Sequence, residues 1–531
     1  MNKPEAKLFN RVRFTEELTQ TDQWDIIIIG GGATGLGTAI DAASRGFKTL
    51  LLEQADFAKG TSSRSTKLVH GGVRYLAQGD IGLVYEALKE RGTLLANAPH
   101  LVRAQEFIIP CYSWAAVLKY LAGLKLYDWL AGRFSFGTSK FRSAKTVRNI
   151  MPTIKSKGLV GGISYYDGQF DDARLAINLA QTAAEHGATV LNYFKVTALL
   201  KTADQISGVT ARDEEQGTSY TLKGKVVINA TGVFVDDILQ MDHPTGKHTV
   251  VPSQGAHIVL DTSFMPSGSA IMIPKTSDGR VLFAVPWHNH LVVGTTDTPL
   301  QQHSLEPVAL EQEIDFILNT AGEYLSKKPE KADILSIFAG LRPLAAPAKE
   351  TGSTKEISRS HKITVSSSGL LSIIGGKWTT YRKMAEDTID RAIQVGKLPK
   401  VSSPTRQIKI HGASGNFASG NPHVELNGYG DDAAGIIELT KGHALPEESI
   451  QPGLPFLIAE VVWAVRNEMA RTLEDVLARR LRLLFLDARK AIEIAPYVAH
   501  LIAKERGLDL SWEQEQVASF KKVAQQYLPQ A

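Results

Sequence analysis

Three glycines and one glutamate near the start of the chain have the residue types and the spacing to hold a nucleotide. Gly30, Gly32 and Gly35 follow a short apolar run, and Glu53 lies on the order of 20 residues downstream. In this pattern the first glycine permits a tight turn, the second lets the backbone approach a pyrophosphate, and the third allows close helix packing. A carboxylate at position 53 can accept a hydrogen bond from an adenosine ribose hydroxyl, which favours FAD or NAD over NADP.

These residues need a strand, a helix and a second strand to position them. Residues 26–29 form an apolar β-branched run, as a buried parallel strand requires. Residues 36–44 predict a helix that ends at Gly46, and residues 49–52 predict the next strand. Free N–H groups at the start of that helix can hold a phosphate charge. Because these parts occur in the right order, the sequence predicts a dinucleotide-binding unit rather than an ordinary glycine-rich turn.

Three further segments carry small or hydroxyl-bearing residues that suit a flat cofactor ring. Residues 61–75 read TSSRSTKLVHGGVRY, and their hydroxyls and glycines can hydrogen-bond a heteroaromatic ring without bulk. Residues 225–232 predict a buried strand that ends at a small-residue turn, where backbone can lie close to a cofactor. Residues 375–381 place two glycines between a strand end and a helix start, which is a second position favourable to an anion.

The bulk composition is that of a globular protein with several domains. At 531 residues the chain is too long for one compact core, so two or three domains are expected. The net charge of +4 leaves no nucleic-acid footprint, and no nucleic-acid partner is expected. A single cysteine, Cys111, excludes an intramolecular disulfide and a cysteine-based metal cluster, so it predicts packing rather than chemistry, and no metal site is expected.

The texture of the sequence divides the chain into three parts. Residues 1–24 form an N-terminal leader segment without the apolar core of a signal peptide. Residues 25–400 predict an α/β nucleotide-binding domain of the Rossmann-like kind, into which a mainly antiparallel β domain is inserted from roughly 80–165 and 245–345. Residues 401–531 begin with a Gly-, Pro- and Ser-rich stretch and continue as a helical cap domain.

Together these strings resemble the respiratory, FAD-dependent glycerol-3-phosphate dehydrogenase family, within the wider amine-oxidase-like flavoproteins. The resemblance covers nearly the whole chain and includes several long, uncommon strings. They are residues 30–35, 61–75, 230–232, 255–257, 294–297, 340–344, 375–382 and 468–480. The resemblance implies an FAD-binding domain of the glutathione-reductase type, a substrate domain built on the inserted sheet, and an all-α C-terminal cap.

The resemblance also implies an activity. The family oxidises sn-glycerol 3-phosphate to dihydroxyacetone phosphate, with hydride transfer from C2 to N5 of FAD, and passes the electrons to a quinone. It implies a cytoplasmic protein attached peripherally to the inner face of the cell membrane. The residues leave open whether the cap supports a homodimer or a contact with another protein.

Four residues resemble the substrate-binding positions of the family: Arg74, Tyr75, Arg342 and Arg359. A phosphate dianion needs fixed cations, and forked guanidinium groups suit it best. Arg74 and Arg342 lie in glycine-flanked apolar strings, whereas Arg359 stands in the next segment, where a surface ion pair is an equal alternative.

Two residues resemble those near the reacting hydroxyl, and both count among the substrate-binding positions. His257 has a reference pKa suited to a base, although a core histidine in a strand stays an alternative. Lys377 can stabilise charge on the reduced ring or on a developing alkoxide. With Arg342 they are the catalytic candidates. The positions that match cofactor contacts are Gly30, Gly32, Gly35, Glu53, Ser62, Ser63, Lys67, Gly72, Thr231, Gly232, Lys377 and Thr379.

Three other features have plainer interpretations. His70 is interpreted as a ring-contacting or structural residue rather than a base. The charged run at residues 474–482 predicts a solvated helix face with local ion pairs. Residues 115–133 mix Trp, Tyr and Leu with Lys and Arg, as interfacial membrane helices do, but a core-packed helix fits the pattern as well.

Several alternatives stay open beside the dehydrogenase. A glycerol-3-phosphate oxidase that reduces dioxygen is the first, but the extra mid-chain segment of such oxidases is not evident. An amine or 2-hydroxy-acid flavoenzyme would bind a carboxylate and need fewer cations. A non-catalytic flavin scaffold would not need the implied site residues, yet Arg74, His257, Arg342 and Lys377 are all present. A nicotinamide dehydrogenase would not need the flavin-like strings at 61–72 and 375–380.

Overall fold

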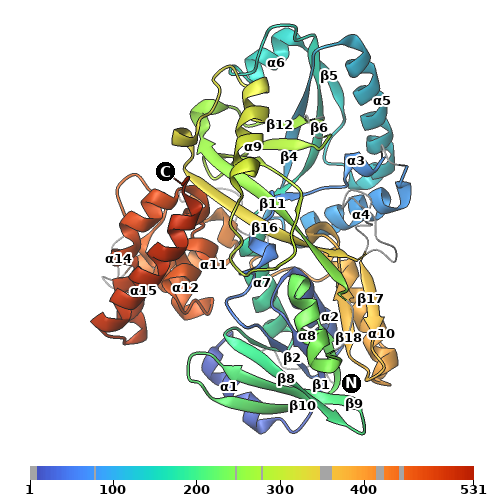
Figure 1. Ribbon diagram of the computed structural model, residues 1–531, viewed down its shortest axis with the longest axis vertical. Helices are drawn as coiled ribbons and strands as arrows, with labels where there is room; N and C mark the ends of the chain where they lie inside the picture. The colour runs from blue at the N-terminus through green and yellow to red at the C-terminus, as the bar shows by residue number, and fades with distance from the viewer. Residues whose placement is uncertain are drawn as a thin grey trace.

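The computed structural model describes residues 9–76, 79–244, 248–274, 276, 279–346, 361–413, 424–441 and 448–530. Within these ranges the side chains of Arg74, Tyr75, Val424 and Glu425 lie outside the description. Figure 1 shows three parts, which are a lower sheet covered by helices, an upper sheet flanked by α5 and α9, and a group of helices beside both. The N-terminal helix α1 (Arg11–Gln20) lies against the lower sheet.

The lower sheet is mainly parallel and has β1 (Trp24–Ile29) at its centre. β1 pairs in parallel with β2 (Thr49–Leu52) and with β10 (Ser219–Asn229). The outer strands of this sheet are β7 (Thr189–Leu191), β18 (Leu371–Ile374), β17 (Lys362–Val365), β8 (Phe194–Thr202) and β9 (Gln205–Asp213). The last two extend β10 as an antiparallel ribbon.

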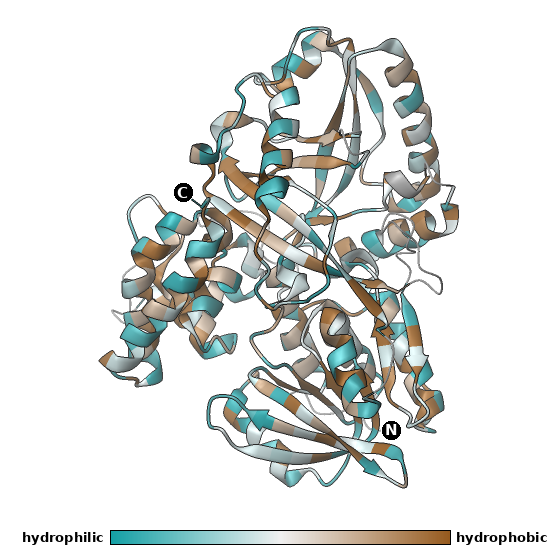
Figure 2. Cartoon of the chain, in the orientation of Figure 1, coloured by the Kyte–Doolittle hydropathy of each residue, from teal (hydrophilic) through white to brown (hydrophobic). Residues whose placement is uncertain are grey.

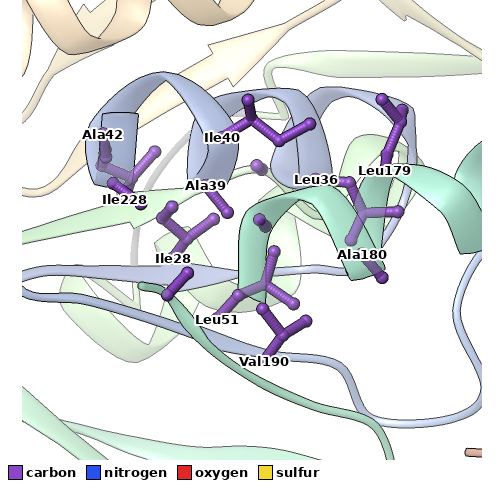
Figure 3. Packing of buried hydrophobic residues seen from close by; sticks show 14 of the residues in the cluster. Ile28, Leu36, Ala39, Ile40, Ala42, Leu51, Leu179, Ala180, Val190 and Ile228 are labelled. Atoms are coloured by element: carbon purple, nitrogen blue, oxygen red, sulfur yellow. The ribbon is translucent and has the colours of Figure 1, made fainter. Parts of the chain in front are cut away.

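The apolar run of β1 explains its central place. Residues 26–29 are at most 4% exposed, because helices cover the strand and neighbouring strands flank it. The covering helices are α2 (Ala33–Ser44), α7 (Asp172–Glu185) and α10 (Tyr381–Val395). Figure 3 shows side chains of α2 and α7 packed against those of β1, β2, β7 and β10. The strand–helix–strand order predicted for residues 26–52 is confirmed.

The upper sheet is ten-stranded and mostly antiparallel, as the sequence predicts for an inserted β domain. Its strands are β15 (Thr298–Pro299), β11 (Val250–Asp261), β14 (His290–Gly294), β13 (Leu282–Trp287), β12 (Ala270–Ile273), β4 (Val102–Cys111), β6 (Gly161–Phe170), β3 (Leu68–Val69), β16 (Ser336–Ala345) and β5 (Lys140–Ser143). β11 and β16 run diagonally from this sheet toward the lower one (Figure 1). Their antiparallel register sets His257 opposite Phe338, and Ser253 opposite Arg342.

Further helices surround the two sheets. They are α3 (Val73–Leu76), α4 (Ile81–Asn97), α5 (Trp114–Ala131), α6 (Ala144–Ile150), α8 (Val235–Asp242) and α9 (Glu311–Tyr324). Among the described residues, no helix combines the length and the apolar character that crossing a bilayer requires.

The C-terminal part is helical and packs against the upper sheet. Its elements are α11 (Asp432–Thr440), α12 (Ile458–Asn467), a π-helical turn (Asp475–Arg480), α13 (Leu483–Leu486), α14 (Ala488–Arg506) and α15 (Leu510–Ala524). Brown and teal alternate along these helices in Figure 2, as expected where one face packs inward. Val259 and Phe338, from β11 and β16, belong to the same apolar cluster as these helices.

The prediction of a solvated helix face at residues 474–482 is wrong. Arg479, Arg480 and Arg482 are only 2–3% exposed. Arg479 and Arg480 belong to the π-helical turn, and Arg482 follows it. All three meet acids that are far away in sequence. Arg480 donates to both oxygens of Asp56, at 2.6 and 3.0 Å, and Arg482 donates to Asp172 at 2.9 Å.

Candidate active site

A cavity of about 590 Å³ lies where the carboxyl ends of β1, β2, β10 and β18 face β11 and β16. Ligands of open α/β sheets bind at this edge of the strands. From the lower sheet, the lining includes the turns after β1 and β10 and the segment before η7 (Trp378–Thr380). From the upper sheet it includes Gly255, His257, Gly340 and Arg342. Both parts of the molecule therefore contribute to one cavity.

The turn from β1 into α2 is a backbone cradle that side chains would fill. Gly30 has φ of +110°, and a Cβ there would lie 2.7 Å from the carbonyl oxygen of Ala230. A Cβ at Gly35 would lie 1.9 Å from the carbonyl oxygen of Gly30, so α2 packs directly on the turn. At Gly32 the Cβ would meet the hydroxyl of Ser62 at 3.0 Å. Bare backbone at a helix start is what a pyrophosphate needs.

Glu53 ends β2 beside this cradle. Its carboxylate accepts hydrogen bonds from the backbone N–H of Gly31 at 2.6 Å and of Ala55 at 2.9 Å. Burial raises the pKa of Glu53, and the two N–H donors oppose that rise. The side chain is therefore fixed at the cavity wall, where its remaining lone pairs suit ribose hydroxyls.

The segment 61–70 forms another wall and is fastened on two sides. Thr61 donates to the carbonyl oxygen of Leu341 at 2.6 Å, and Trp378 donates its indole N–H to the carbonyl oxygen of Ser62 at 2.8 Å. The backbone N–H of His70 donates to the hydroxyl of Thr379 at 3.1 Å. This segment is therefore tied to β16 and to the start of α10, and His70 lines the cavity as a wall residue.

His257 is almost enclosed at the edge of the cavity. It is 2% exposed, and its ring stacks on Phe338 with centroids 4.7 Å apart. Its Nε2 shares a hydrogen bond of 2.9 Å with the hydroxyl of Thr66. Burial, then the charges of Lys67 and Arg342, hold the pKa of His257 well below its usual range. The imidazole is therefore neutral at physiological pH and able to accept a proton.

Arg342 presents a cation to the same cavity. Its guanidinium donates to Thr295 at 3.1 Å and pairs with Asp297 at 3.4 Å. A Cβ at Gly255 would lie 2.4 Å from one of its terminal nitrogens, so a glycine there makes room for the guanidinium. The side chain is 24% exposed, which leaves the charge accessible to an anion.

Most predicted site residues meet at this cavity. Those that line it are Gly30, Gly32, Glu53, Ser62, Thr231, Gly232, His257, Arg342, Lys377 and Thr379. Gly35, Ser63, Lys67 and Gly72 are not among the lining residues. Gly35 serves the packing of α2 instead. The side chains of Arg74 and Tyr75, and the whole of Arg359, lie outside the described residues.

Lys67, which is predicted as a cofactor contact, does not line the cavity, and its side chain lies inside the protein. Its ammonium is fully buried and donates to Asp172 and to the carbonyl oxygen of Ser63, each at 2.7 Å. Burial lowers the pKa of Lys67 to about 7 although Asp172 opposes the shift. It lies 5.1 Å from the ring of Phe338, on which His257 stacks. Its charge thus acts on the histidine from behind the cavity wall.

Sequence reasoning missed Thr66 and Asp172. Thr66 stands in the hydroxyl-rich string 61–75, and that string was the only signal for it. Asp172 opens α7, where an acid is ordinary, so nothing local in the sequence marks it as the partner of Lys67 and Arg482.

Known proteins match this chain along almost all of its length. The family model described as FAD dependent oxidoreductase matches residues 25–382, and the model described as C-terminal domain of alpha-glycerophosphate oxidase matches residues 371–517. The mitochondrial glycerol-3-phosphate dehydrogenase of Macaca fascicularis is 39% identical, over 95% of this chain and 74% of that protein. Its counterpart in Schizosaccharomyces pombe is 38% identical, over 94% of this chain and 87% of that protein.

A solved structure is also similar. The glycerol-3-phosphate dehydrogenase of Bacillus halodurans, determined in complex with FAD, superposes with a TM-score of 0.79 at 30% identity, covering 98% of each chain. The bare cradle at Gly30–Gly32, the fixed Glu53 and the hydroxyl-rich wall at 61–70 fit the phosphates, ribose and ring of such a cofactor.

Proposed function

Because this chain belongs to the FAD-dependent oxidoreductases, and among them to the glycerol-3-phosphate dehydrogenases, we propose that it oxidises sn-glycerol 3-phosphate to dihydroxyacetone phosphate. One observation carries the proposal beyond the family assignment. An accessible guanidinium, Arg342, and a neutral, buried imidazole, His257, share one cavity with the cradle for the cofactor. An anionic group and a proton to be removed are the two demands of this substrate.

The cofactor is FAD, and this chain has residues for each of its parts. The backbone at Gly30 and Gly32 would hold the pyrophosphate, Glu53 would hold the adenosine ribose, and the walls at 61–70 and 375–379 would enclose the ring. When bound, FAD supplies the acceptor for a hydride. The protein's own part is to bind and orient the substrate, exclude water and remove a proton.

Removal of a hydride from C2 leaves a hydroxyl that must lose its proton. His257 serves as the base, because burial and nearby cations keep its imidazole neutral. A phosphate dianion beside Arg342 offsets one of those cations and so raises the affinity of His257 for the proton. Lys377, which also lines the cavity, would stabilise the negative charge that develops on the substrate oxygen as the hydroxyl loses its proton.

Three predicted residues complete the proposed phosphate site. Arg74, Tyr75 and Arg359 remain predictions, since their side chains fall outside the described residues. Arg74 and Tyr75 belong to α3, which follows the cavity segment 61–70 in the chain. Substitution of each arginine by lysine and by methionine, with KM for glycerol 3-phosphate as the readout, tests whether a fixed guanidinium is needed.

We further propose that the electrons pass to a quinone and that α5 lies on the membrane surface. One face of α5 packs inward, with Val117, Leu124 and Tyr127 buried. On the rest of the helix Leu118 and Trp129 are 68% and 75% exposed. The same stretch of sequence carries basic residues, with Lys119 and Lys125 in α5 and Arg133 just after it. This mixture suits an anionic interface.

Flotation with liposomes tests this surface. The Leu118→Ser/Trp129→Ser double variant is expected to lose binding to anionic vesicles while keeping its rate with a soluble electron acceptor. The matched control is a double change of two exposed apolar residues elsewhere, Val12→Ser and Leu510→Ser, which are 68% and 65% exposed. Equal binding by the α5 variant and the wild type would contradict the proposal.

The central test is anaerobic mixing of the purified flavoprotein with glycerol 3-phosphate in a stopped-flow instrument. Bleaching of the oxidised flavin band is expected with this substrate and not with glycine or lactate. Re-oxidation is then followed with a soluble quinone and with dioxygen, which separates the dehydrogenase from the oxidase. A protein that carries flavin and does not bleach would overturn the proposed substrate.

A further inference from the structure

Thr66 and His257 line the cavity side by side, and the hydroxyl of Thr66 is hydrogen-bonded to the imidazole. Thr66 lines the cavity and is half-buried, whereas His257 is 2% exposed. The hydrogen bond of 2.9 Å to Thr66 is the polar contact found for Nε2, and the buried Nδ1 has no hydrogen-bond partner within the described residues. The hydroxyl of Thr66 is therefore the polar group that can orient Nε2 of the imidazole at the cavity wall.

Apart from the hydrogen bond to Thr66, apolar packing holds the ring of His257. Phe338 stacks on it with only 11° between the ring planes. On the edge of the ring, a Cβ at Gly294 would lie 2.2 Å from Cδ2, so the imidazole occupies the space a side chain would need. Packing therefore fixes the plane of the imidazole, and Thr66 is left as the adjustable partner.

Both neighbours of Thr66 in the chain are bound to one carboxylate. Asp172 Oδ2 accepts hydrogen bonds from the backbone N–H of Ser65 at 3.0 Å and from its hydroxyl at 2.7 Å. The same oxygen accepts from the ammonium of Lys67 at 2.7 Å. Lys67 also has φ of +64°, a left-handed conformation that is unfavourable for a lysine unless its surroundings hold it. Asp172 is therefore the anchor of the segment that carries Thr66.

The C-terminal part of the chain holds that anchor. Arg482 donates to the other oxygen of Asp172 at 2.9 Å and to the carbonyl oxygen of Ser63 at 2.9 Å. Its side chain is 2% exposed, and it lies over the rings of Trp287 and Phe485. The guanidinium of Arg482 thus binds both Asp172 and the backbone of the segment that carries Thr66.

We propose that the C-terminal helical part positions the catalytic histidine, with Arg482 holding Thr66 against His257 through Asp172. Arg482 does not line the cavity, so it is a positioning residue that acts through three others. The inference rests on the proposed function, since it assigns His257 to that reaction. It gives the C-terminal part a task in catalysis in addition to its packing against the upper sheet.

The test is a double-mutant cycle on kcat of the FAD-loaded enzyme. Thr66→Val and Arg482→Met are each expected to lower kcat by about tenfold to a hundredfold, as a small misplacement at a reacting group does. KM for glycerol 3-phosphate should stay within about twofold, because neither residue is a predicted phosphate ligand. Because Thr66 lines the cofactor cavity, FAD content is measured for each variant and kcat is expressed per bound FAD. The double variant should be no slower than Thr66→Val alone, since both changes act through one contact.

Matched variants separate positioning from general damage. Thr66→Ser keeps the hydroxyl and should recover most of the wild-type rate. Arg479→Met removes an arginine of equal burial from the same segment, one that pairs with Asp56 and Glu474 instead of Asp172, so its effect should multiply with that of Thr66→Val. Ser65→Ala removes the hydroxyl that donates to Asp172 and accepts from the backbone N–H of Lys67. It serves if Arg482→Met does not fold, and it should lower kcat as well.

Two outcomes would overturn the inference. The first is a wild-type kcat in both Arg482→Met and Ser65→Ala while Thr66→Val is slow. The second is multiplication of the Arg482 and Thr66 effects in the double variant. Failure of the proposed function would show earlier and differently, because the wild-type protein itself would not be reduced by glycerol 3-phosphate.

Discussion

The cavity and the contact between its walls and the C-terminal helices both contain arginines, but they use them in opposite ways. In the cavity, Arg342 is 24% exposed and reaches Asp297 only at 3.4 Å. At the C-terminal contact, Arg480 and Asp56 have fully buried side chains that meet at 2.6 Å. The first charge is partly exposed at the cavity wall. The second is satisfied inside the protein and contributes to structure.

The same contrast appears in pKa values. Burial alone would raise the pKa of Asp56, but Arg480 and Arg479 overcome it and hold the pKa at about 2. His257 is buried as well, yet no acid compensates it, so burial and nearby cations lower its pKa. The paired arginines therefore keep Asp56 charged, whereas burial beside cations keeps the imidazole of His257 neutral.

The largest expected effect comes from removing the acid at the closed contact. Asp56→Ala leaves Arg479 and Arg480 without their shared partner in a buried place, which is expected to cost about 3–5 kcal/mol of unfolding free energy. Chemical denaturation measures it. The triple variant with both arginines also changed to Met should regain most of the loss. If the unfolding free energy of Asp56→Ala lies within about 1 kcal/mol of the wild-type value, the two arginines do not depend on Asp56 in the way that their burial implies.

Next is the loss of the available charge in the cavity. Arg342→Met is expected to lower kcat/KM by about 10²–10³, the effect of removing one charged donor from a reacting site. The melting temperature should change little, because a partly exposed ion pair contributes little to stability. Arg342→Lys is the matched control, and its kcat/KM should lie between those of the wild type and of Arg342→Met. A large loss of stability with unchanged kcat/KM would place Arg342 with the structural arginines.

Lys67 is buried like the structural arginines, but its charge also acts on His257 in the cavity wall. Its substitution therefore tests how far the two regions are separate. Its cation helps to lower the pKa of His257, so Lys67→Met should raise that pKa and move the acid limb of the kcat/KM profile to higher pH. In the wild type the limb is expected below the usual histidine pKa of about 6.5. A profile that does not move would separate Lys67 from the electrostatics of the cavity. Lys67→Arg, which keeps the charge, is the control.

The smallest effect concerns an ion pair at the rim of the C-terminal contact. Burial would lower the pKa of His411, but hydrogen bonds to Asp432 and Glu185 overcome it and raise the pKa to about 10. A raised pKa means that its contribution to stability is complete below about pH 6.5 and is lost as pH rises toward 10. Thermal denaturation across this range should show the decline, and His411→Gln should flatten it.

The sequence predicted the cavity better than the contact for a physical reason. The cradle and Glu53 lie within one strand–helix–strand unit, so periodicity and spacing determine their geometry. Asp56 and Arg480 are 424 residues apart, and only the folded chain brings them together. The run at 474–482 also carries local i,i+4 pairs, such as Arg479 with Asp475, which are typical of an exposed helix. Burial of Arg479 and Arg480 could not be derived from that pattern.

Lys67 and Thr66 show the same limit at short range. The string 61–75 predicted a wall for a flat ring, and seven of its residues line the cavity: Thr61, Ser62, Arg64, Ser65, Thr66, Leu68 and His70. Which side chains face inward depends on the left-handed turn at Lys67 and on Asp172, which comes from another helix. Composition therefore located the wall, but it did not reveal which hydroxyl would meet the histidine.

The buried pairing of Asp56 with Arg479 and Arg480 also bears on how the protein is made. Asp56 leaves the ribosome 424 residues before Arg480, a delay of roughly 20–85 s at 5–20 residues per second. During that time the nucleotide-binding unit carries an acid whose partners have not been synthesised. Burial of this acid against its two arginines is therefore completed only after the C-terminal part has been synthesised, and a chain that ends before Arg479 leaves Asp56 without either of them.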